Sequence, residues 1–455
     1  MNKIWTLKTL SHAAGGRLEG APEDTPVSGI SIDTRTLGPG DAYFAIKGVR
    51  MDGHQFVPAA LAAGASAAVV SHGEADRAIH VDDVLAALER VGIAARGRLG
   101  AETPVVAVTG SVGKTGTKEM LRLAFGPGTH AAAASYNNHW GVPLTLSRMP
   151  ADASAGIFEI GMNHAGEITP LTRMVRPHIA IITTVQPVHL EFFDSVDGIA
   201  DAKAEIFEGL DEGGTAIVPA DIAQTGRLVA AAREKAARVV TFGAPDADVA
   251  LVAYDPQSGA ADAQAFGTRV RYTIRGGAHI ARNSLAVLAA LHAAGRPFDA
   301  IDALSGWSAQ KGRGRRVMLD VAGGQATLLD EAYNANPASM GAAIVSLGAT
   351  PATRRIAVLG DMLELGATAP DLHRGLVPLL VDAGVRIVHT VGTMTSHLTD
   401  SLPFEMRGLH CEDAAAMAEA LPPLEPGDAL LVKGSNAVGL GRVVEAVETR
   451  TGQER

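Results

Sequence analysis

The sequence predicts an α/β protein with a small mixed α/β N-terminal domain, a doubly wound central domain and a Rossmann-like C-terminal domain. Three observations predict this architecture. The chain has 455 residues, enough for about three domains of ~150 residues each. From residue 105 onward, short apolar runs alternate with helical patterns, which is typical of parallel sheets covered by helices. Polar breaks at 102–104 and 307–316 then predict domains at 1–102, 103–312 and 313–455.

The first domain is expected to contain short elements separated by Gly and Pro turns. Apolar runs predict strands at 30–32, 43–46 and 67–70, and a helical pattern covers 56–63. This combination predicts a small mixed α/β domain.

The second domain begins with the continuous apolar run at 105–108, of the kind buried on both faces of a parallel sheet. Alternation of strands and helices then predicts the doubly wound sheet. The further elements expected are strands at 157–160, 180–184, 216–218 and 239–242 and helices at 199–210 and 221–237.

The third domain repeats this alternation, which predicts a Rossmann-like sheet. Its parallel strands are expected at 326–329, 356–359, 387–391 and 429–432. Its helices are expected at 339–347, 372–383, 414–421 and 442–447.

Composition and charge exclude several classes of protein. Hydrophobic residues make up 47% and charged residues 19%, which argues against extensive disorder. The formal net charge of -10 provides no global positive field for a nucleic-acid backbone, so we expect no nucleic-acid partner. The single cysteine, Cys411, suits a reducing compartment. Because the N-terminus lacks the apolar core of a secretory signal and no apolar run is long enough to span a bilayer, we expect a cytoplasmic protein without a membrane span.

The strongest functional signal is the segment Thr-Gly-Ser-Val-Gly-Lys-Thr at 109–115, between a predicted strand and a helix-compatible run at 117–125. There, backbone amides can wrap a polyphosphate, a lysine can reach the β and γ oxygens, and the Thr115 hydroxyl can hold Mg²⁺. The residues expected to contact the nucleotide are Gly110, Ser111, Val112, Gly113, Lys114 and Thr115. The sequence thus predicts a P-loop ATPase domain. Val108 stands where the usual pattern has its first glycine, and a tight Gly turn with an incidental lysine is the alternative.

Other polar residues follow predicted strands of this domain. Glu159 lies at the end of one strand, and His189 and Glu191 follow the next. The carboxyl ends of parallel strands gather ligands, so a carboxylate and an imidazole there could ligate metal ions that bridge nucleotide and substrate. Taken alone, His189 would more often be a hydrogen-bonded structural histidine.

Eight motifs, spread in order over all three domains, closely resemble the muramyl ligases of peptidoglycan synthesis. They are Gly110-Ser-Val-Gly-Lys-Thr115, Asn137-Asn138 with Gly141-Val-Pro143, Glu159-Ile-Gly161-Met-Asn163, His189-Leu-Glu191, Ala202-Lys-Ala-Glu-Ile-Phe207, Asp330-Glu-Ala-Tyr-Asn-Ala-Asn-Pro337, Gly360-Asp-Met-Leu-Glu-Leu-Gly366 and Lys433-Gly-Ser435. The motifs at 333–337 and 360–366 are specific to the family member that uses D-alanyl-D-alanine. The member that adds the third residue of the stem peptide is the alternative.

The resemblance implies that ATP phosphorylates the terminal carboxylate of UDP-N-acetylmuramoyl-tripeptide and that the amine of D-alanyl-D-alanine attacks the acyl phosphate. A carboxylate is a poor electrophile, so it needs this activation, and the mixed anhydride must be shielded from water. ATP and Mg²⁺ are the implied cofactors, and the product serves cell-wall biogenesis, cell shape and cell division. We expect the enzyme to be a monomer.

The resemblance also implies roles around the phosphates. Lys114 and Thr115 would serve the phosphates and one Mg²⁺, while Glu159 and His189 would help to hold the metals. Lys203 matches the lysine that is carbamylated in this family, which would support a second Mg²⁺. Without the resemblance, a solvated lysine on an amphipathic helix explains Lys203 equally well.

Further positions match the nucleotide contacts of the family. Asn283 matches the adenine-contacting asparagine, although Ile280 stands where an asparagine is common. Arg313 is the preferred candidate for the arginine that reaches the nucleotide, and Arg315 is close enough to compete; a solvated basic linker is the alternative. Asp330 would hydrogen-bond the ribose.

The remaining matches concern the other substrates. Tyr333, Asn334 and Asn336 would approach the dipeptide, although Asp, Asn and Pro in sequence also make an ordinary turn. In the first domain, Arg or Lys would meet the UDP diphosphate within short, turn-like segments. The first-domain residues that match are Ser31, Asp33, Thr34, Arg35, Lys47, Asp52 and His54. The expected substrate-binding set is completed by Asn137, Asn138 and Lys433.

Two other classes of protein share part of this pattern. A P-loop nucleotide switch or transport ATPase would also contain residues 109–115, but no Asn-Lys-x-Asp guanine-reading motif occurs and a complete α/β domain follows. A catalytically inactive UDP-sugar-binding scaffold would not need Lys114, Glu159, His189 and Lys203 together. If phosphate release requires the UDP-tripeptide together with an amine, the protein is the ligase rather than either of these two classes.

Overall fold

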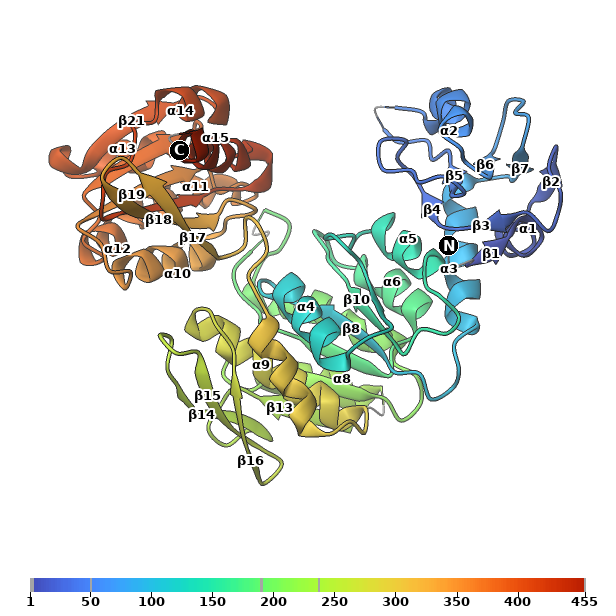
Figure 1. Cartoon of the computed structure of the whole chain (residues 1–455). Helices are drawn as coiled ribbons and strands as arrows, with labels where there is room; N and C mark the ends of the chain where they lie inside the picture. The colour runs from blue at the N-terminus through green and yellow to red at the C-terminus, as the bar shows by residue number, and fades with distance from the viewer. Residues whose placement is uncertain (1–3, 50, 189–190, 236–237, 454–455) are drawn as a thin grey trace.

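The structure is a computed structural model that describes residues 4–49, 51–188, 191–235 and 238–453. Within these ranges, the strands form sheets of two, five, nine and six strands. The five-, nine- and six-stranded sheets lie in three successive lobes of the chain, coloured blue, cyan to yellow, and orange to red (Figure 1). The predicted three-part α/β architecture is therefore confirmed.

The N-terminal lobe has a five-stranded sheet in the order β2-β7-β6-β5-β4, in which only β2 is antiparallel. Its strands are β2 (Arg17–Glu19), β4 (Ile30–Ser31), β5 (Ala42–Phe44), β6 (Ala67–Val70) and β7 (Ala78–His80), and β1 (Trp5–Thr6) pairs with β3 (Pro26–Val27). Its helices are α1 (Leu7–Ala14), α2 (Val57–Ala62) and α3 (Val84–Gly97). The predicted strands are present, but α1 and α3 were not predicted.

Helix α3 also joins this lobe to the central one. The buried guanidinium of Arg96 donates hydrogen bonds to the carbonyl oxygens of Val175 and Arg176 in the central lobe, at 2.9 and 2.8 Å. The indole of Trp5 donates to the carbonyl oxygen of Ser147 at 2.9 Å. These buried contacts fix the N-terminal lobe to the central one.

The central sheet has the order β16-β15-β14-β13-β12-β11-β8-β10-β9. Neighbours from β9 through β14 are parallel, and β15 and β16 extend the sheet as antiparallel strands. The bounds are β8 (Val105–Thr109), β9 (Thr129–Ala131), β10 (Ala155–Glu159), β11 (Ile179–Ile182), β12 (Thr215–Pro219), β13 (Arg238–Phe242), β14 (Val249–Tyr254), β15 (Ala260–Ala265) and β16 (Thr268–Thr273). In β8, Val106 and Val108 pack in one core, whereas Val105 and Ala107 pack in the other. The continuous apolar run therefore reflects burial on both faces.

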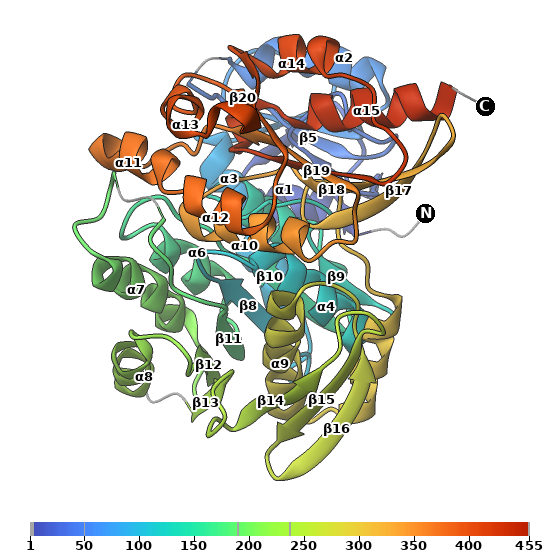
Figure 2. The ribbon, with the colours of Figure 1, turned by 90° about the vertical axis from the view of Figure 1, so that its left-hand side faces the viewer.

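Helices cover both faces of this sheet, as the prediction of a doubly wound sheet required. They are α4 (Lys114–Phe125), α5 (Gly141–Ser147), α6 (Ile168–Val175), α7 (Val196–Ala204), α8 (Thr225–Glu234) and α9 (Ala278–Ala293), with 3₁₀ turns η2 (Glu205–Gly209) and η3 (Phe298–Gly306). The helix predicted at 199–210 thus ends as a 3₁₀ turn. In Figure 2, α7 and α8 lie on one side, and the antiparallel strands extend below α9.

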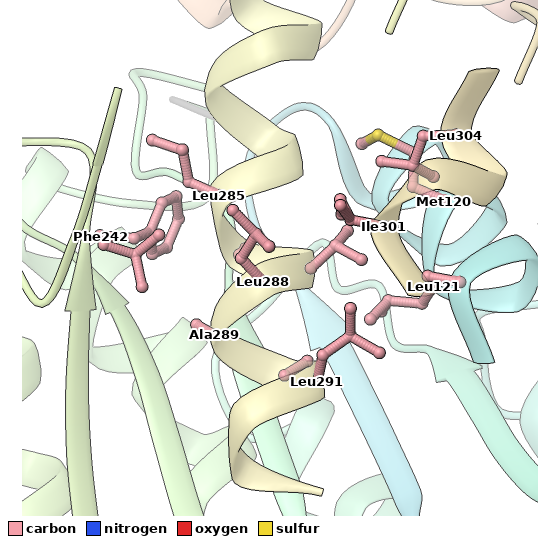
Figure 3. Close-up of a cluster of buried hydrophobic side chains, with 14 of the residues drawn as sticks. Met120, Leu121, Phe242, Leu285, Leu288, Ala289, Leu291, Ile301 and Leu304 are labelled. Atoms are coloured by element: carbon pink, nitrogen blue, oxygen red, sulfur yellow. The ribbon is translucent and has the colours of Figure 1, made fainter. Parts of the chain in front are cut away.

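Helix α9 was not predicted, although it forms the centre of one core. Every residue from Ser284 to Leu291 is buried, so the segment lacks the one-sided apolar pattern of a surface helix. Figure 3 shows Leu285, Leu288 and Leu291 of α9 among side chains of α4, η3 and β13. The labelled partners are Met120, Leu121, Ile301, Leu304 and Phe242.

The C-terminal sheet has the order β17-β18-β22-β19-β20-β21, parallel except for β17. Its strands are β17 (Arg315–Val321), β18 (Gly324–Glu331), β19 (Arg354–Gly360), β20 (Ile387–Val391), β21 (Arg407–Cys411) and β22 (Asp428–Lys433). Its helices are α10 (Pro337–Gly348), α11 (Ala369–Arg374), α12 (Val377–Asp382), α13 (Ser396–Ser401), α14 (Ala414–Ala420) and α15 (Gly441–Gln453). The single helix predicted at 372–383 is wrong: it is two helices, because Pro378 cannot continue α11 and instead lies in the first turn of α12. None of the helices in the described part of the chain combines the length and apolarity needed to cross a membrane.

Candidate active site

A cavity of about 810 Å³ lies between the central and C-terminal lobes. Part of its lining comes from segments that follow strand carboxyl ends of both sheets, which is where open α/β sheets bind ligands. Lining residues from such segments are Ser111 after β8, Gly161 after β10, Thr184 after β11, Tyr333 after β18 and Ser435 after β22. The cavity is the candidate active site.

The P-loop forms one wall of this cavity, and its glycines are structurally required. Gly113 has a φ of 86° at the N-cap of α4, and a Cβ there would lie 2.4 Å from Asn283 Nδ2. Gly110 has a φ of 147°, and its Cβ would lie 1.9 Å from Thr183 Oγ1. Neither position therefore has room for a side chain, so the backbone of the loop is exposed at the N-terminus of α4. This backbone cradle fits a phosphate anion. Asn283 touches this cradle.

Lys114 begins α4 and lies across the loop. Its Nζ donates to the carbonyl oxygen of Gly110 at 2.6 Å. Burial lowers the pKa of Lys114, Glu159 opposes that shift, and the charge of Arg313 adds to it. Because burial and a neighbouring cation disfavour the ammonium, an anionic ligand at this position would stabilise it.

Beside the loop, four side chains form a connected oxygen-rich group. Thr115 Oγ1 donates to Glu159 Oε2 at 2.9 Å, and Asn137 Nδ2 donates to Glu159 Oε1 at 2.7 Å. The hydroxyl oxygens of Ser135 and Thr115 are 3.4 Å apart. Hydroxyl and carboxylate oxygens are the hard ligands that Mg²⁺ prefers, so this group fits that ion. Sequence reasoning missed Ser135, whose only signal is its position two residues before Asn137.

Lys203 on α7 is a buried lysine rather than a solvated one, with 2% of its surface exposed. No hydrogen bond or ion pair joins its ammonium to another described residue. Burial, followed by the charge of Lys114, holds the pKa of Lys203 well below its usual value. The other predicted metal ligand, His189, lies outside the described residues.

The two competing arginines are separated by their positions. Arg313 lines the cavity, stacks over the Tyr333 ring at 3.7 Å and donates to Ser135 Oγ at 2.9 Å. Arg315 begins β17 and pairs instead with Asp330 at 3.2 Å and Glu448 at 2.7 Å. The geometry therefore favours Arg313 as the arginine beside the P-loop.

Asp330 does not line the cavity, although it was expected to bind the ribose. It is 1% exposed, and its Oδ2 accepts hydrogen bonds from the Gly312 amide at 2.8 Å and from Arg315. The carboxylate thus fixes the chain segment that enters the third domain. The Asp330 carboxylate is therefore already hydrogen-bonded within the protein, which does not favour a contact with the ribose. The predicted ribose contact stays a prediction.

The predicted acceptor residues Tyr333, Asn334 and Asn336 all line the cavity. Asn336 is also the N-cap of α10, where its Oδ1 accepts from the Ser339 amide at 2.9 Å. Its amide nitrogen has no hydrogen bond to another described residue, so it can donate to a ligand. Lys433 lines the cavity too, and its Nζ donates to the Asn334 carbonyl oxygen at 2.7 Å.

The structure does not bring the predicted first-domain residues to this cavity. Ser31, Asp33, Thr34, Arg35, Lys47, Asp52 and His54 all belong to the N-terminal lobe and are absent from the cavity lining. Several are engaged locally: Asp33 pairs with Arg35 at 2.6 Å, and Asp52 contacts His54 Nδ1 at 2.6 Å. Asn138 Oδ1 accepts from the Gly141 amide at 2.9 Å and also lies outside the lining.

Lys118 is a further residue that sequence reasoning missed. It is fully buried on α4, donates to the Ala132 carbonyl oxygen at 2.6 Å and pairs with Glu119 at 3.0 Å. It therefore holds the segment that leads to Ser135. Its only sequence signal is its position one helical turn after Lys114.

Lys118→Met should lower the free energy of unfolding by about 1–3 kcal/mol, because a buried carbonyl oxygen and Glu119 would lose a charged partner. Urea denaturation followed by circular dichroism measures this change. Lys311→Met is the matched control, since Lys311 forms an exposed ion pair with Glu445, worth about 0–1 kcal/mol. Equal losses in both variants would contradict the assigned role of Lys118.

Three family models match successive parts of the chain. The Mur ligase family catalytic domain matches residues 26–95, the Mur ligase middle domain matches 108–291, and the Mur ligase glutamate ligase domain matches 312–436. Each match falls on one of the three sheets that form the lobes, and only β2 and the first residues of β8 lie outside the matched ranges.

Whole-chain comparisons agree with these matches. The chain is 31% identical to UDP-N-acetylmuramoyl-tripeptide–D-alanyl-D-alanine ligase of Rickettsia prowazekii, over 97% of this chain and 99% of that protein. The structure of MurF from Acinetobacter baumannii is similar with a TM-score of 0.84 at 29% identity, over 98% and 99% of the two chains. MurF from Thermotoga maritima, in complex with ADP, has a TM-score of 0.78 at 25% identity, over 94% and 99%. The chain with this P-loop cavity belongs to the Mur ligase family.

Proposed function

We propose that this chain is the ATP-dependent ligase that joins D-alanyl-D-alanine to the tripeptide carboxylate of UDP-N-acetylmuramoyl-tripeptide. The observation that carries the proposal is the cavity, which places the P-loop opposite Tyr333, Asn334 and Asn336 of the third domain. A phosphoryl donor, a carboxylate and an amine can therefore meet in one space. The name of the Rickettsia relative supports this pair of substrates.

In the first step, the tripeptide carboxylate attacks the γ-phosphorus of ATP and forms an acyl phosphate and ADP. The backbone amides of the P-loop, the Lys114 ammonium and the Arg313 guanidinium would stabilise the charge on the transferring phosphoryl group. In the second step, the amine attacks the acyl carbon and phosphate leaves. A cavity enclosed between two domains would limit hydrolysis of the acyl phosphate.

We propose Mg²⁺ as the cofactor because oxygen ligands gather beside the P-loop. Thr115, Glu159, His189 and the carbamate of Lys203 would hold it. Bound there, Mg²⁺ would neutralise charge on the phosphate oxygens. Asn283 lines the cavity and matches the adenine-contacting asparagine of the family, so it would contact the adenine.

The N-terminal lobe would bind the UDP end of the donor. Its candidate residues are Ser31, Asp33, Thr34, Arg35, Lys47, Asp52 and His54. We also propose the domain division 1–102, 103–312 and 313–455. The enzyme would act as a monomer in the cytoplasm. Asn137 would help to position the substrate through Glu159, to which its side-chain amide donates a hydrogen bond.

A substrate matrix tests the proposal. UDP-N-acetylmuramoyl-tripeptide and the corresponding dipeptide are each offered with D-alanyl-D-alanine or with single amino acids, and phosphate release is measured. We expect release only with the tripeptide and D-alanyl-D-alanine together. Release with the dipeptide and one amino acid would indicate the ligase that adds the third residue, and release with ATP alone would indicate a switch ATPase.

Asn336 offers a test of the acceptor side. Asn336→Ser should keep the N-cap of α10 but remove the amide N–H donors, so the KM for D-alanyl-D-alanine should rise ~10-fold or more while the KM for ATP changes little. Asn336→Ala should show the same KM effect and also lose about 1 kcal/mol of stability through the lost cap. Initial rates and thermal unfolding measure both. A rise confined to the KM for ATP would assign Asn336 to the nucleotide side.

A further inference from the structure

The acceptor side of the cavity contains a carboxylate, Glu331, that has no assigned role. It is the last residue of β18, and 23% of its side chain is exposed. Its carboxylate makes no hydrogen bond to another described residue, and it forms a 3.8 Å ion pair with the Nζ of Lys433, which lies opposite Glu331 on the neighbouring strand β22. A ligand can therefore bind this carboxylate without displacing a hydrogen bond of the described protein.

Other carboxylates lining the cavity are already bonded. Glu159 accepts from Thr115 and Asn137, and Asp221 forms a bidentate pair with Arg282. These contacts tie both carboxylates to the central domain, where the nucleotide is expected. Glu331 belongs instead to the third domain and lies two residues before Tyr333, in the segment expected to bind the acceptor.

The acceptor needs such a group for a chemical reason. The α-amino group of a peptide has a pKa of ~7.7–8.0, so at neutral pH it is largely an ammonium without a lone pair. It must be bound by an anion and must lose a proton before its nitrogen can attack. We propose, on the basis of the proposed function, that Glu331 binds the ammonium of the acceptor and takes its proton.

The step balances as follows. The ammonium N–H bond breaks, its proton moves to Glu331, and its electron pair stays on nitrogen. That pair forms the bond to the acyl carbon, and the carbon–oxygen bond to phosphate breaks with its electrons on the phosphate oxygen. The second proton lost from nitrogen leaves with the phosphate as hydrogen phosphate, which gives a neutral amide.

The surroundings of Glu331 suit this task. Burial is the main cause that raises the pKa of Glu331, and Asp330 on the same strand also raises it. Lys433 from β22, Arg313 from the preceding segment and Arg316 from β17 oppose the shift. A raised pKa makes the carboxylate a stronger base than an exposed glutamate and brings its pKa closer to that of the amine.

Glu331→Gln, which keeps the shape but removes the base, tests this role with two amines. At pH 7, the kcat/KM for D-alanyl-D-alanine should fall by at least about 100-fold, the usual contribution of a general base. Hydroxylamine, which is largely uncharged at pH 7, needs neither ammonium binding nor the removal of a proton from a cation. Its conversion of the tripeptide to the hydroxamate should therefore proceed near the wild-type rate, which also shows that the variant is folded and forms the acyl phosphate.

The pH dependence provides a second readout. The residual rate of the variant with D-alanyl-D-alanine should rise about tenfold per pH unit below the pKa of the amine, because only the amine that is already neutral can react. Wild-type enzyme should show a shallower rise. Glu331→Asp should recover part of the activity, and Glu419→Gln on the exposed face of α14 is the charge-matched control.

Three outcomes would overturn the proposal. The first is an equal loss of activity of Glu331→Gln with D-alanyl-D-alanine and with hydroxylamine, and the second is a pH profile of this variant that matches the wild type. The third is that Glu364→Gln, rather than Glu331→Gln, loses activity with D-alanyl-D-alanine alone, since Glu364 also lines the cavity. Failure of the proposed function is a separate result: wild-type enzyme would use a single amino acid rather than D-alanyl-D-alanine. The same comparison with that amino acid and hydroxylamine would then still test Glu331.

Discussion

Lys114→Ala should lower the rate of phosphate release at saturating substrates by at least about 100-fold. Lys114 lines the cavity and lies across the P-loop, with its Nζ hydrogen-bonded to the Gly110 carbonyl oxygen. Removing one group that stabilises a transferring phosphoryl group typically costs ~3 kcal/mol or more, which corresponds to this loss. Initial rates of phosphate release with both substrates present measure the effect.

The loss should not come from unfolding. Burial and the charge of Arg313 already disfavour the Lys114 ammonium, so its removal relieves an electrostatic cost while losing the hydrogen bonds to the carbonyl oxygens of Gly110 and Ser111. Thermal unfolding should therefore stay near that of the wild type. Lys235→Ala, in an ion pair with Glu208 away from the cavity lining, is the control for activity. Near wild-type turnover of Lys114→Ala would contradict the ATP site.

The sequence was sufficient to predict elements whose signal is local. The apolar run in β8 and the P-loop that follows it are contiguous, so strand, loop and helix could be recognised together. Helix α9 gave no such signal, because a helix buried on all sides lacks a polar face. Ser135 and Lys118 were missed for another reason, since each matters only through a contact made in the folded chain.

Strand register explains why the sequence could not separate Arg313 from Arg315. In β17, Arg315 lies opposite Asp330 of β18, and the two side chains pair. Arg313 precedes the strand and reaches Ser135 in the central domain. Arg313 and Arg315, only two positions apart, thus have different partners. Strand pairing, which the sequence does not show, determines which of them lines the cavity. The same pairing occupies Asp330, which the motif alone had suggested for the ribose.

Lys203→Ala should lower activity by more than about 100-fold while leaving the protein folded, because the proposed metal-binding carbamate would be lost. In the structure the Lys203 ammonium is buried, has no ionic partner within the described ranges and is disfavoured further by Lys114. The lowered pKa favours the neutral amine, which is the form that adds to CO₂ and releases one proton. The product carries a negative charge and hard oxygen ligands of the kind that Mg²⁺ prefers. Charge reversal would remove the buried cation and its repulsion by Lys114, and the carbamate would supply oxygen ligands for a metal ion.

Two measurements check this expectation independently of each other. With ¹³C-labelled CO₂, wild-type protein should show a carbamate carbon signal by NMR that Lys203→Ala lacks, whether or not substrates are present. Acetate or formate should enter the space left by the side chain and restore part of the activity, whereas chloride at equal ionic strength should not. Failure of rescue alone carries less weight because the cavity can collapse around the smaller residue. Full activity of Lys203→Ala in CO₂-depleted buffer, or a wild-type spectrum without the carbamate signal, would leave Lys203 as a buried neutral lysine with no part in metal binding.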